Sequence, residues 1–172
     1  MEETQKDIAY SITNVLTRYC QGIDMQDWEA VRSCFHHDAT DLHGSFQGSP
    51  DELVAWLRAR HEGVHAAMHT LTNVLINATA NADRAQVVSY SITYEQVSGT
   101  HARTLDARLP KTVREALVTI SCQYHDEFES RGGRWAISRR RVVYDWIRVE
   151  DAKVLTPIPV GWPTTRRKEN HH

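Results

Sequence analysis

The spacing of the apolar residues changes near residue 68, and this change limits the folds that the chain can adopt. Before about residue 60, apolar side chains recur every three or four residues, which is the spacing of one helical face. From Met68 onward the pattern becomes extended, in stretches at about 68–79, 85–97, 114–129 and 134–149. Three helices followed by a strand-rich half predict an α+β fold, in which a curved, mostly antiparallel sheet wraps around the long first helix.

The three predicted helices differ in how their ends are marked. The first has one apolar face and is expected to end at Gly22, because glycine commonly stops a helix. In the third, Ser49 can cap the helix, Pro50 suits its first position and Glu52 completes a capping box. The apolar faces of the first two helices consist of Ile8, Ile12, Val15, Leu16, Tyr19 and Cys20, and of Trp28, Val31, Cys34 and Phe35.

Length and composition favour one globular domain. The 172 residues can form a single core, with the domain expected over 1–150 and a proline-containing tail over 151–172. A net charge of -2 gives no reason to expect nucleic acid or a membrane as a partner. The N-terminus lacks an apolar signal region, so a cytoplasmic location is expected. The final His171-His172 pair resembles the start of a purification tag and is given no functional role. Buried, reduced thiols are predicted at Cys20, Cys34 and Cys122.

Asp24 and His69 form the candidate catalytic pair. A carboxylate that orients an imidazole gives a general base that needs no cofactor, and histidine titrates near neutral pH. Period-two geometry places His69 on the same side of its strand as Leu71, Asn73 and Leu75. Each residue also has an alternative role. Asp24 precedes a short helix and could cap it through backbone amides, and His69 could be a hydrogen-bonded core histidine.

The segments that carry these residues resemble the SnoaL-like branch of the nuclear-transport-factor-2-like superfamily, which contains scytalone dehydratase, bile acid 7α-dehydratase and hexachlorocyclohexane dehydrochlorinase. They are Arg18–Asp24 at the end of the first helix, the short helix after it, and Ala67–Thr70. The resemblance covers about residues 5–150. It implies a cone-shaped α+β barrel with three N-terminal helices packed in the sheet, and a catalytic dyad formed by Asp24 and His69.

Four further residues are candidates for the site. Tyr19 could donate a hydrogen bond to a substrate oxygen, as the tyrosine at the matching position of bile acid dehydratase implies, or it could simply pack in the core. If the resemblance holds for the fold, Asn73 faces into the cone with His69. Tyr144 is favoured as a second pocket residue, and Asp41 is a further candidate for substrate binding.

A metal site is an alternative interpretation, because His61, His65 and His69 recur every four residues and histidines with this spacing on a helix can share a metal. The extended pattern begins at Met68, however, which takes His69 off the helical face. The sequence therefore predicts no metal site. It also contains no glycine-rich phosphate-binding loop, so no nucleotide cofactor is predicted. The arginines at 139–141 are expected to alternate faces and form salt bridges rather than bind an anion.

Two segments outside the regular pattern remain. Residues 98–113 form a stretch longer than a hairpin turn needs, which is typical of a lid or a disordered loop. The tail at 155–163 is rich in proline, and its apolar residues are expected to pack over a subunit surface. These residues are Leu155, Ile158, Val160 and Trp162. A homo-oligomer is expected, and the resemblance places a trimer ahead of a dimer.

The function predicted is that of a cofactor-independent lyase of the dehydratase kind, or an isomerase, acting on a small, mainly apolar cyclic or polyketide-like molecule. His69 would remove a carbon-bound proton, Asp24 would stabilise the imidazolium, and Tyr19 would donate to developing oxygen charge. The alternative is a non-catalytic ligand-binding or assembly module, such as the small subunit of a ring-hydroxylating dioxygenase. A closed, apolar cavity with Asp24 and His69 in contact would favour catalysis, whereas a filled cone with a flat apolar outer sheet would favour assembly.

Overall fold

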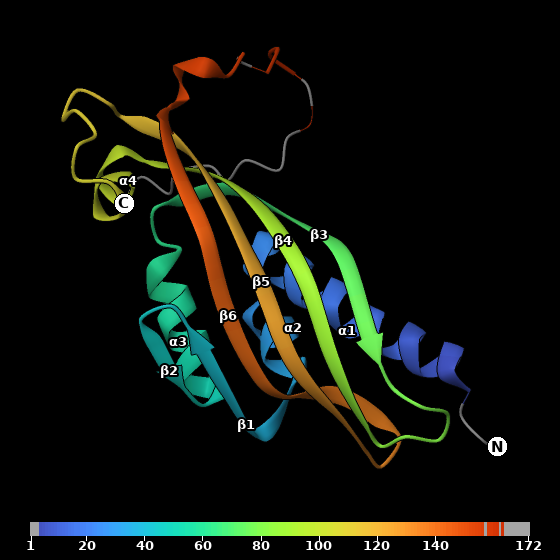
Figure 1. The fold of residues 1–172 in the computed structure, drawn as a ribbon. Helices are drawn as coiled ribbons and strands as arrows, with labels where there is room; N and C mark the ends of the chain where they lie inside the picture. The colour runs from blue at the N-terminus through green and yellow to red at the C-terminus, as the bar shows by residue number, and fades with distance from the viewer. Residues whose placement is uncertain (1–3, 157, 162, 164–172) are drawn as a thin grey trace.

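A computed structural model describes residues 4–156, 158–161 and 163, and confirms the α+β fold. Within this part of the chain, four α-helices pack with one six-stranded sheet, as Figure 1 shows. The elements are α1 (Gln5–Met25), α2 (Trp28–Ser33), β1 (Phe35–His43), β2 (Phe46–Gly48), α3 (Pro50–Arg60), β3 (Val64–Asn77), β4 (Arg84–Ser98), α4 (Gly99–Leu105), β5 (Glu115–Arg131) and β6 (Arg134–Asp151), followed by a 3-10 turn at Ala152–Val154.

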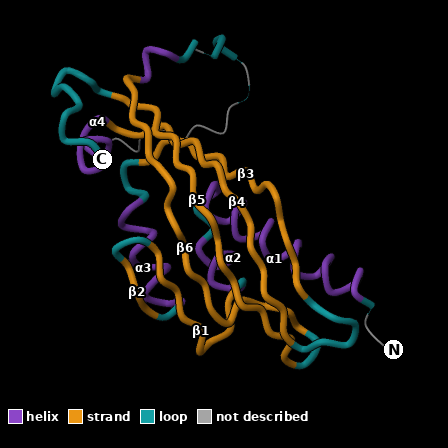
Figure 2. Tube along the Cα trace, in the orientation of Figure 1, coloured by secondary structure: helices purple, strands orange, loops and turns teal. Residues whose placement is uncertain are grey.

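The sheet is mostly antiparallel, in the order β2-β1-β6-β5-β4-β3. Strands β3 to β6 form a long antiparallel meander, whereas β1 lies parallel to β6. Figures 1 and 2 show these strands curving across α1, which covers one face of the sheet. The inner face of the sheet and the apolar face of α1 therefore enclose the main core.

Helix α1 has the predicted buried face but not the predicted end. Ile8, Ile12 and Leu16 are fully buried, and the helix starts with a capping box between Thr4 and Asp7. Gly22 does not stop the helix, which continues to Met25. Instead, Gly22 is the point where α1 approaches α2, because a Cβ there would lie 2.9 Å from Cγ2 of Val31. The prediction mistook a close-packing glycine for a helix end.

Strands β1 and β2 were not predicted, and β3 begins at Val64 rather than Met68. The start of β1 is polar, with His36, His37 and Asp38 in succession. Its extended conformation depends on pairing with β6, about a hundred residues further along, for example between Asp41 and Arg140. Such a strand is set by a distant partner and not by its own pattern.

A bulge in β3 overturns the predicted orientation of that strand beyond Thr72. The register with β4 shifts between Thr72 and Leu75, and Asn73 has a φ of 49°. A β-bulge inserts unpaired residues and so reverses the faces that follow it. Leu75 is consequently exposed, whereas Ile76 packs against the core beside Val87.

The segment 98–113 is ordered and partly helical. Ser98 caps α4 by accepting from the N–H of His101, and Ala102 is fully buried. Ala102 belongs to a second apolar cluster, which it forms with neighbouring residues of β3, β4 and β5. In the tail, Leu155, Ile158 and Val160 are exposed, and Trp162 lies outside the described residues. No described helix is long and apolar enough to span a membrane.

The core contains a fully buried ion pair, between Arg140 and Asp126. The guanidinium of Arg140 donates to both carboxylate oxygens of Asp126 at 2.7 Å, and it lies over the rings of Tyr19 and Tyr124 at 4.2 and 4.4 Å. Arg139 instead points outward to Glu127. The alternation predicted for this arginine run is confirmed.

Candidate active site

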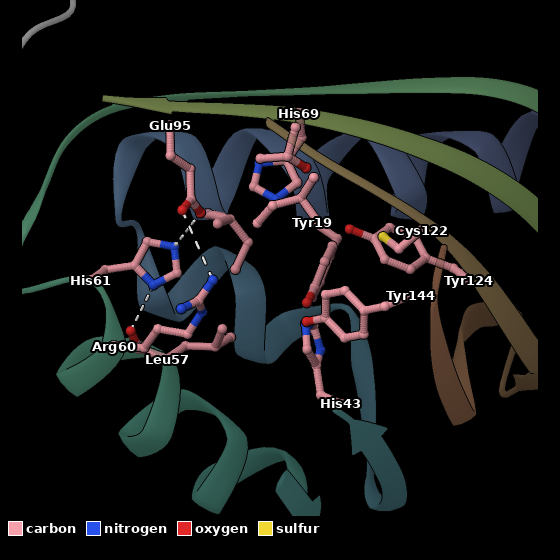
Figure 3. A pocket seen from close by; sticks show the side chains of 13 residues that line it. Tyr19, His43, Leu57, Arg60, His61, His69, Glu95, Cys122, Tyr124 and Tyr144 are labelled. Atoms are coloured by element: carbon pink, nitrogen blue, oxygen red, sulfur yellow. Dashed lines mark hydrogen bonds and ion pairs between the residues drawn. The ribbon is translucent and has the colours of Figure 1, made fainter. Parts of the chain in front are cut away.

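A cavity of about 30 Å³ lies between α1 and the inner face of the sheet, and Figure 3 shows its lining side chains. The lining combines ionisable, phenolic and apolar groups. They are Tyr19, Ile23, His43, Leu57, Arg60, His61, His69, Thr93, Glu95, Ile120, Cys122, Tyr124 and Tyr144. A surface groove of about 270 Å³ adjoins this cavity and shares His43, Arg60 and Tyr144 with it. Cavity and groove together approach the volume of a small-molecule site.

The structure brings Asp24 and His69 together. Nδ1 of His69 lies 2.6 Å from Oδ1 of Asp24, and the backbone N–H of His69 donates to both carboxylate oxygens at 3.1 and 3.0 Å. The side chains are 10% and 20% exposed for His69 and Asp24. Because Nδ1 faces the carboxylate, Nε2 is the nitrogen left to face the cavity.

The alternative role considered for Asp24, as the cap of the second helix, is wrong. Asp24 lies within the last turn of α1, and the cap of α2 is Asp27, which accepts from the N–H of Ala30 at 3.0 Å. A residue on the last turn of α1 can reach across to β3, and this placement positions the Asp24 carboxylate opposite His69.

Two of the predicted phenols line the cavity. Tyr19 is almost completely buried, between Arg140 and the edges of Phe35 and Tyr124. Burial raises the pKa of Tyr19 well above its ordinary value, and it raises the pKa of Tyr144 to about 12. Both side chains therefore keep their protons near neutral pH and can donate hydrogen bonds to a bound oxygen.

The structure does not bring Asn73 and Asp41 to the cavity wall. Asn73 is exposed at the bulge in β3, so its predicted place facing into the cone is wrong. The residue stands where the alternation fails, which the period-two argument could not anticipate. Asp41 is buried behind the cavity, with Oδ1 3.5 Å from Nδ1 of His43.

Several ionisable residues of the cavity were not predicted as part of the site, namely His43, Arg60, His61 and Glu95. Arg60 Nη2 lies 3.9 Å from Oε2 of Glu95, and His61 Nε2 lies 4.0 Å from Oε1 of the same carboxylate. Glu95 is only 3% exposed. A signal existed, since alternation in β4 puts Glu95 on one face with Thr93 and two serines. The other face of β4 is more apolar, however, and a hydrophobicity argument would have turned that face inward.

Burial controls the protonation of two further lining groups. It lowers the pKa of His61 to about 4, although the charge of Glu95 opposes this shift, so that His61 is neutral at pH 7. Its Nδ1 donates to the carbonyl oxygen of Leu57 at 2.8 Å. Burial also raises the pKa of the Cys122 thiol to about 11, which makes it a poor nucleophile near neutral pH. All three cysteines are free and buried, as predicted.

The histidines at 61, 65 and 69 face three different carboxylates, belonging to Glu95, Glu115 and Asp24. Among the described residues, no group of three histidine, cysteine or acidic side chains could hold a metal ion. The chemistry available from the described lining side chains is proton transfer and hydrogen bonding.

Solved structures with a similar fold include a putative scytalone dehydratase from Novosphingobium aromaticivorans, with 18% identity, a TM-score of 0.64, and 91% of this chain and 95% of the other covered. A hexachlorocyclohexane dehydrochlorinase, LinA-type3, from Novosphingobium barchaimii has 16% identity, a TM-score of 0.67, and coverage of 88% and 94%. A protein of unknown function from Mycobacterium tuberculosis has 22% identity, a TM-score of 0.64, and coverage of 82% and 78%. At these identities the likeness concerns the fold.

No curated protein matches the chain. The domain family does, since residues 7–141 match the SnoaL-like domain, which is most of the sequence. The match includes α1, β3 and the greater part of the sheet, and therefore both members of the Asp24–His69 pair. The chain belongs to the SnoaL-like family of the nuclear-transport-factor-2-like superfamily.

Proposed function

We propose that this protein catalyses a cofactor-independent elimination or isomerisation of a small, mainly apolar cyclic or polyketide-like molecule. The observation that supports this most directly is the 2.6 Å contact between His69 Nδ1 and Asp24 Oδ1 at the cavity wall. In this arrangement Nε2 of His69 removes a carbon-bound proton, and Asp24 stabilises the imidazolium that forms.

The phenols supply the second requirement of such a reaction. Removing a proton next to a carbonyl group places negative charge on oxygen, which hydrogen-bond donors stabilise. Tyr19 and Tyr144 line the same cavity as His69 and remain protonated. Elimination of water is the preferred version, and similarity to a putative scytalone dehydratase and a dehydrochlorinase supports a lyase.

Substrate entry is proposed from the groove beside α3. The inner cavity of about 30 Å³ holds little more than a water molecule, whereas the groove offers about 270 Å³ and shares Arg60 and Tyr144 with it. A ring-sized substrate would occupy the groove and reach His69 as the shared side chains move apart.

The second candidate is a non-catalytic assembly module. The outer face of the sheet supports it, because several large apolar residues there are exposed. They are Met68, Tyr90, Tyr94 and Trp146. This surface is compatible with catalysis too, since an enzyme can also assemble through its sheet.

The test is turnover of a panel of hydroxylated and chlorinated rings, including scytalone and hexachlorocyclohexane, followed by loss of substrate and appearance of the alkene. We expect His69→Ala to lower turnover by about 10²-fold to 10⁴-fold, the usual contribution of a general base. The matched control is His37→Ala, which removes an exposed imidazole and should change nothing. Equal turnover by wild type and His69→Ala would exclude the mechanism, and binding without turnover would favour an assembly module.

A further inference from the structure

A second imidazole–carboxylate pair stands on the other side of the same cavity. Asp41 and His43 lie two residues apart on β1, where they pair with Arg140 and Val142 of β6, whose side chains are buried. Both residues therefore point inward. Nδ1 of His43 lies 3.5 Å from Oδ1 of Asp41. His69 likewise directs its Nδ1 at the carboxylate of Asp24. In Figure 3, His69 descends from β3 and His43 rises from β1.

The carboxylate of Asp41 lacks the hydrogen bonds that its burial requires. Its side chain is completely buried, and neither oxygen accepts a hydrogen bond from the described residues. The nearby Asp126 is also buried, but each of its carboxylate oxygens accepts a hydrogen bond from Arg140. A carboxylate removed from water needs a positively charged or donating partner. His43 is the basic group that the structure places in ion-pair range of Asp41.

His43 also occupies the junction between cavity and groove. It lines both, together with Arg60 and Tyr144. The Trp56 ring packs against the imidazole in a tilted arrangement, with 5.4 Å between ring centroids. The Tyr144 ring meets it edge-on, with 6.2 Å between centroids. These rings pack around the imidazole, and a substrate that enters through the groove passes His43 before it reaches His69.

We propose that His43 is a second catalytic residue, which gives a proton to the leaving hydroxyl of the substrate after His69 has removed the carbon-bound proton and left an enolate, and that Asp41 is its positioning residue. This inference rests on the elimination proposed above. It narrows the substrate to an alcohol, because hydroxide is a poor leaving group unless it is protonated, whereas a halide needs no proton.

The step balances without a further reactant. Nε2 of His69 takes the proton from the carbon that lies between a carbonyl group and the carbon that carries the hydroxyl, and the C–H electrons move onto the carbonyl oxygen as an enolate. As the carbonyl re-forms, these electrons make the new carbon–carbon double bond. The C–O bond then breaks, its electron pair stays on oxygen, and the proton on Nε2 of protonated His43 completes a water molecule. His69 then loses a proton to solvent and His43 regains one, which restores both groups.

The first arm of the test is spectroscopic and needs no substrate. In long-range proton–nitrogen spectra of protein with ¹⁵N-labelled histidine, we expect His69 to carry its proton on Nδ1 and His43 to carry a proton on both ring nitrogens, because the leaving hydroxyl takes its proton from Nε2 of His43. Asp41→Asn should change the signals of His43 and leave those of His69, and Asp24→Asn should do the reverse. A His43 that has no proton on Nε2, or that does not respond to Asp41→Asn, would overturn the assignment.

The second arm separates proton removal from loss of water, with scytalone as the probe in D₂O. Wild type should incorporate deuterium and release water. His43→Gln should incorporate deuterium at a rate within about threefold of wild type, but it should release water at least about 10²-fold more slowly than wild type. His69→Ala should lose both deuterium incorporation and water release. His37→Ala again serves as control.

The outcomes distinguish the two proposals. A His43→Gln variant that eliminates water at the wild-type rate, or that loses exchange as His69→Ala does, would show that His43 is not the acid, while the role of His69 would stand. A wild type that neither exchanges nor eliminates water on scytalone or on any other hydroxylated ring of the panel would remove the proposed function and the leaving-group role with it.

Discussion

His69 is held by Asp24 through two of its own donors at once. The backbone N–H and Nδ1 both point at the same carboxylate, so the position of the strand and the orientation of the ring are fixed by one side chain. A base held this way loses little freedom when it reacts, which favours proton transfer. The identity of the group at position 24 therefore affects the tautomer of His69 as well as its position.

Asp24→Asn should lower turnover by about 10²-fold to 10⁴-fold with little loss of stability, because an amide keeps an oxygen for the backbone N–H but no longer fixes the proton on Nδ1. The measurement is kcat on the active probe together with the thermal midpoint. Asp27→Asn is the control, since asparagine caps a helix as well as aspartate does. Loss of activity in both variants would point to a structural effect instead.

His61 should make stability depend on pH. Its pKa is about 4 in the folded protein, lowered by burial from about 6.5, so the unfolded chain binds more protons between these values and stability falls as the pH falls through this window. The shift corresponds to about 3 kcal/mol. Urea unfolding at several pH values measures this dependence. Between pH 7 and pH 4, the free energy of unfolding of wild type should fall by about 3 kcal/mol more than that of His61→Gln. Parallel profiles would contradict the assignment.

At the scale of elements, the bulge in β3 separates the part of the strand that carries His69 from its outer end. Up to Thr72 the strand keeps His69 facing the cavity, and beyond Asn73 it turns Leu75 outward and Ile76 to the core. The left-handed backbone at Asn73 allows this change, and asparagine tolerates that conformation better than most residues.

Asn73→Val should destabilise the protein by about 1 to 2 kcal/mol, since a β-branched residue fits poorly at a positive φ. Asn73→Gly should be close to neutral. Thr72→Val is the matched control on the same exposed stretch and should change stability by less than about 0.5 kcal/mol. Urea denaturation measures all three. A tolerated valine at 73 would mean that the bulge is not needed for the fold.

At the scale of the whole molecule, the buried Arg140–Asp126 pair joins β6 to β5 beneath α1, where Tyr19 covers the guanidinium. Arg140→Met should cost about 3 to 5 kcal/mol, because it leaves Asp126 buried without its partner. The double variant with Asp126→Leu should recover most of this loss. The measurement is chemical denaturation of wild type, of the two single variants Arg140→Met and Asp126→Leu, and of the double variant, which gives the coupling free energy between the two side chains. Losses of stability that simply add would show that the two side chains do not act as a unit.

The outer face of the sheet belongs to the same scale. Its exposed Met68, Tyr94 and Trp146, together with the apolar residues of the tail, motivate the prediction of a homo-oligomer, with a trimer ahead of a dimer. Light scattering should give an oligomer at micromolar concentration and a smaller species when residues from Leu155 onward are removed. A monodisperse monomer at full length would exclude this prediction.

By itself, the sequence determined the features that local interactions set. The buried face of α1, the capping box of α3 and the alternation along the long strands follow from side chains a few residues apart, and all three are present. The Asp24–His69 pair came from a resemblance between short segments. Their contact confirms the predicted geometry, while the catalytic role stays a prediction.

Only the tertiary structure decided which face of each strand is buried and which distant groups meet. In β4 the face with Tyr90 and Tyr94 points outward, while Glu95 points to the cavity, because the sheet curves around α1 and the cavity interrupts the apolar core on its inner face. Likewise, β1 exists through its pairing with β6, and that pairing carries His43 and Asp41 inward. Contacts between residues far apart in the chain leave no periodic signal, so these parts of the site had to come from the fold.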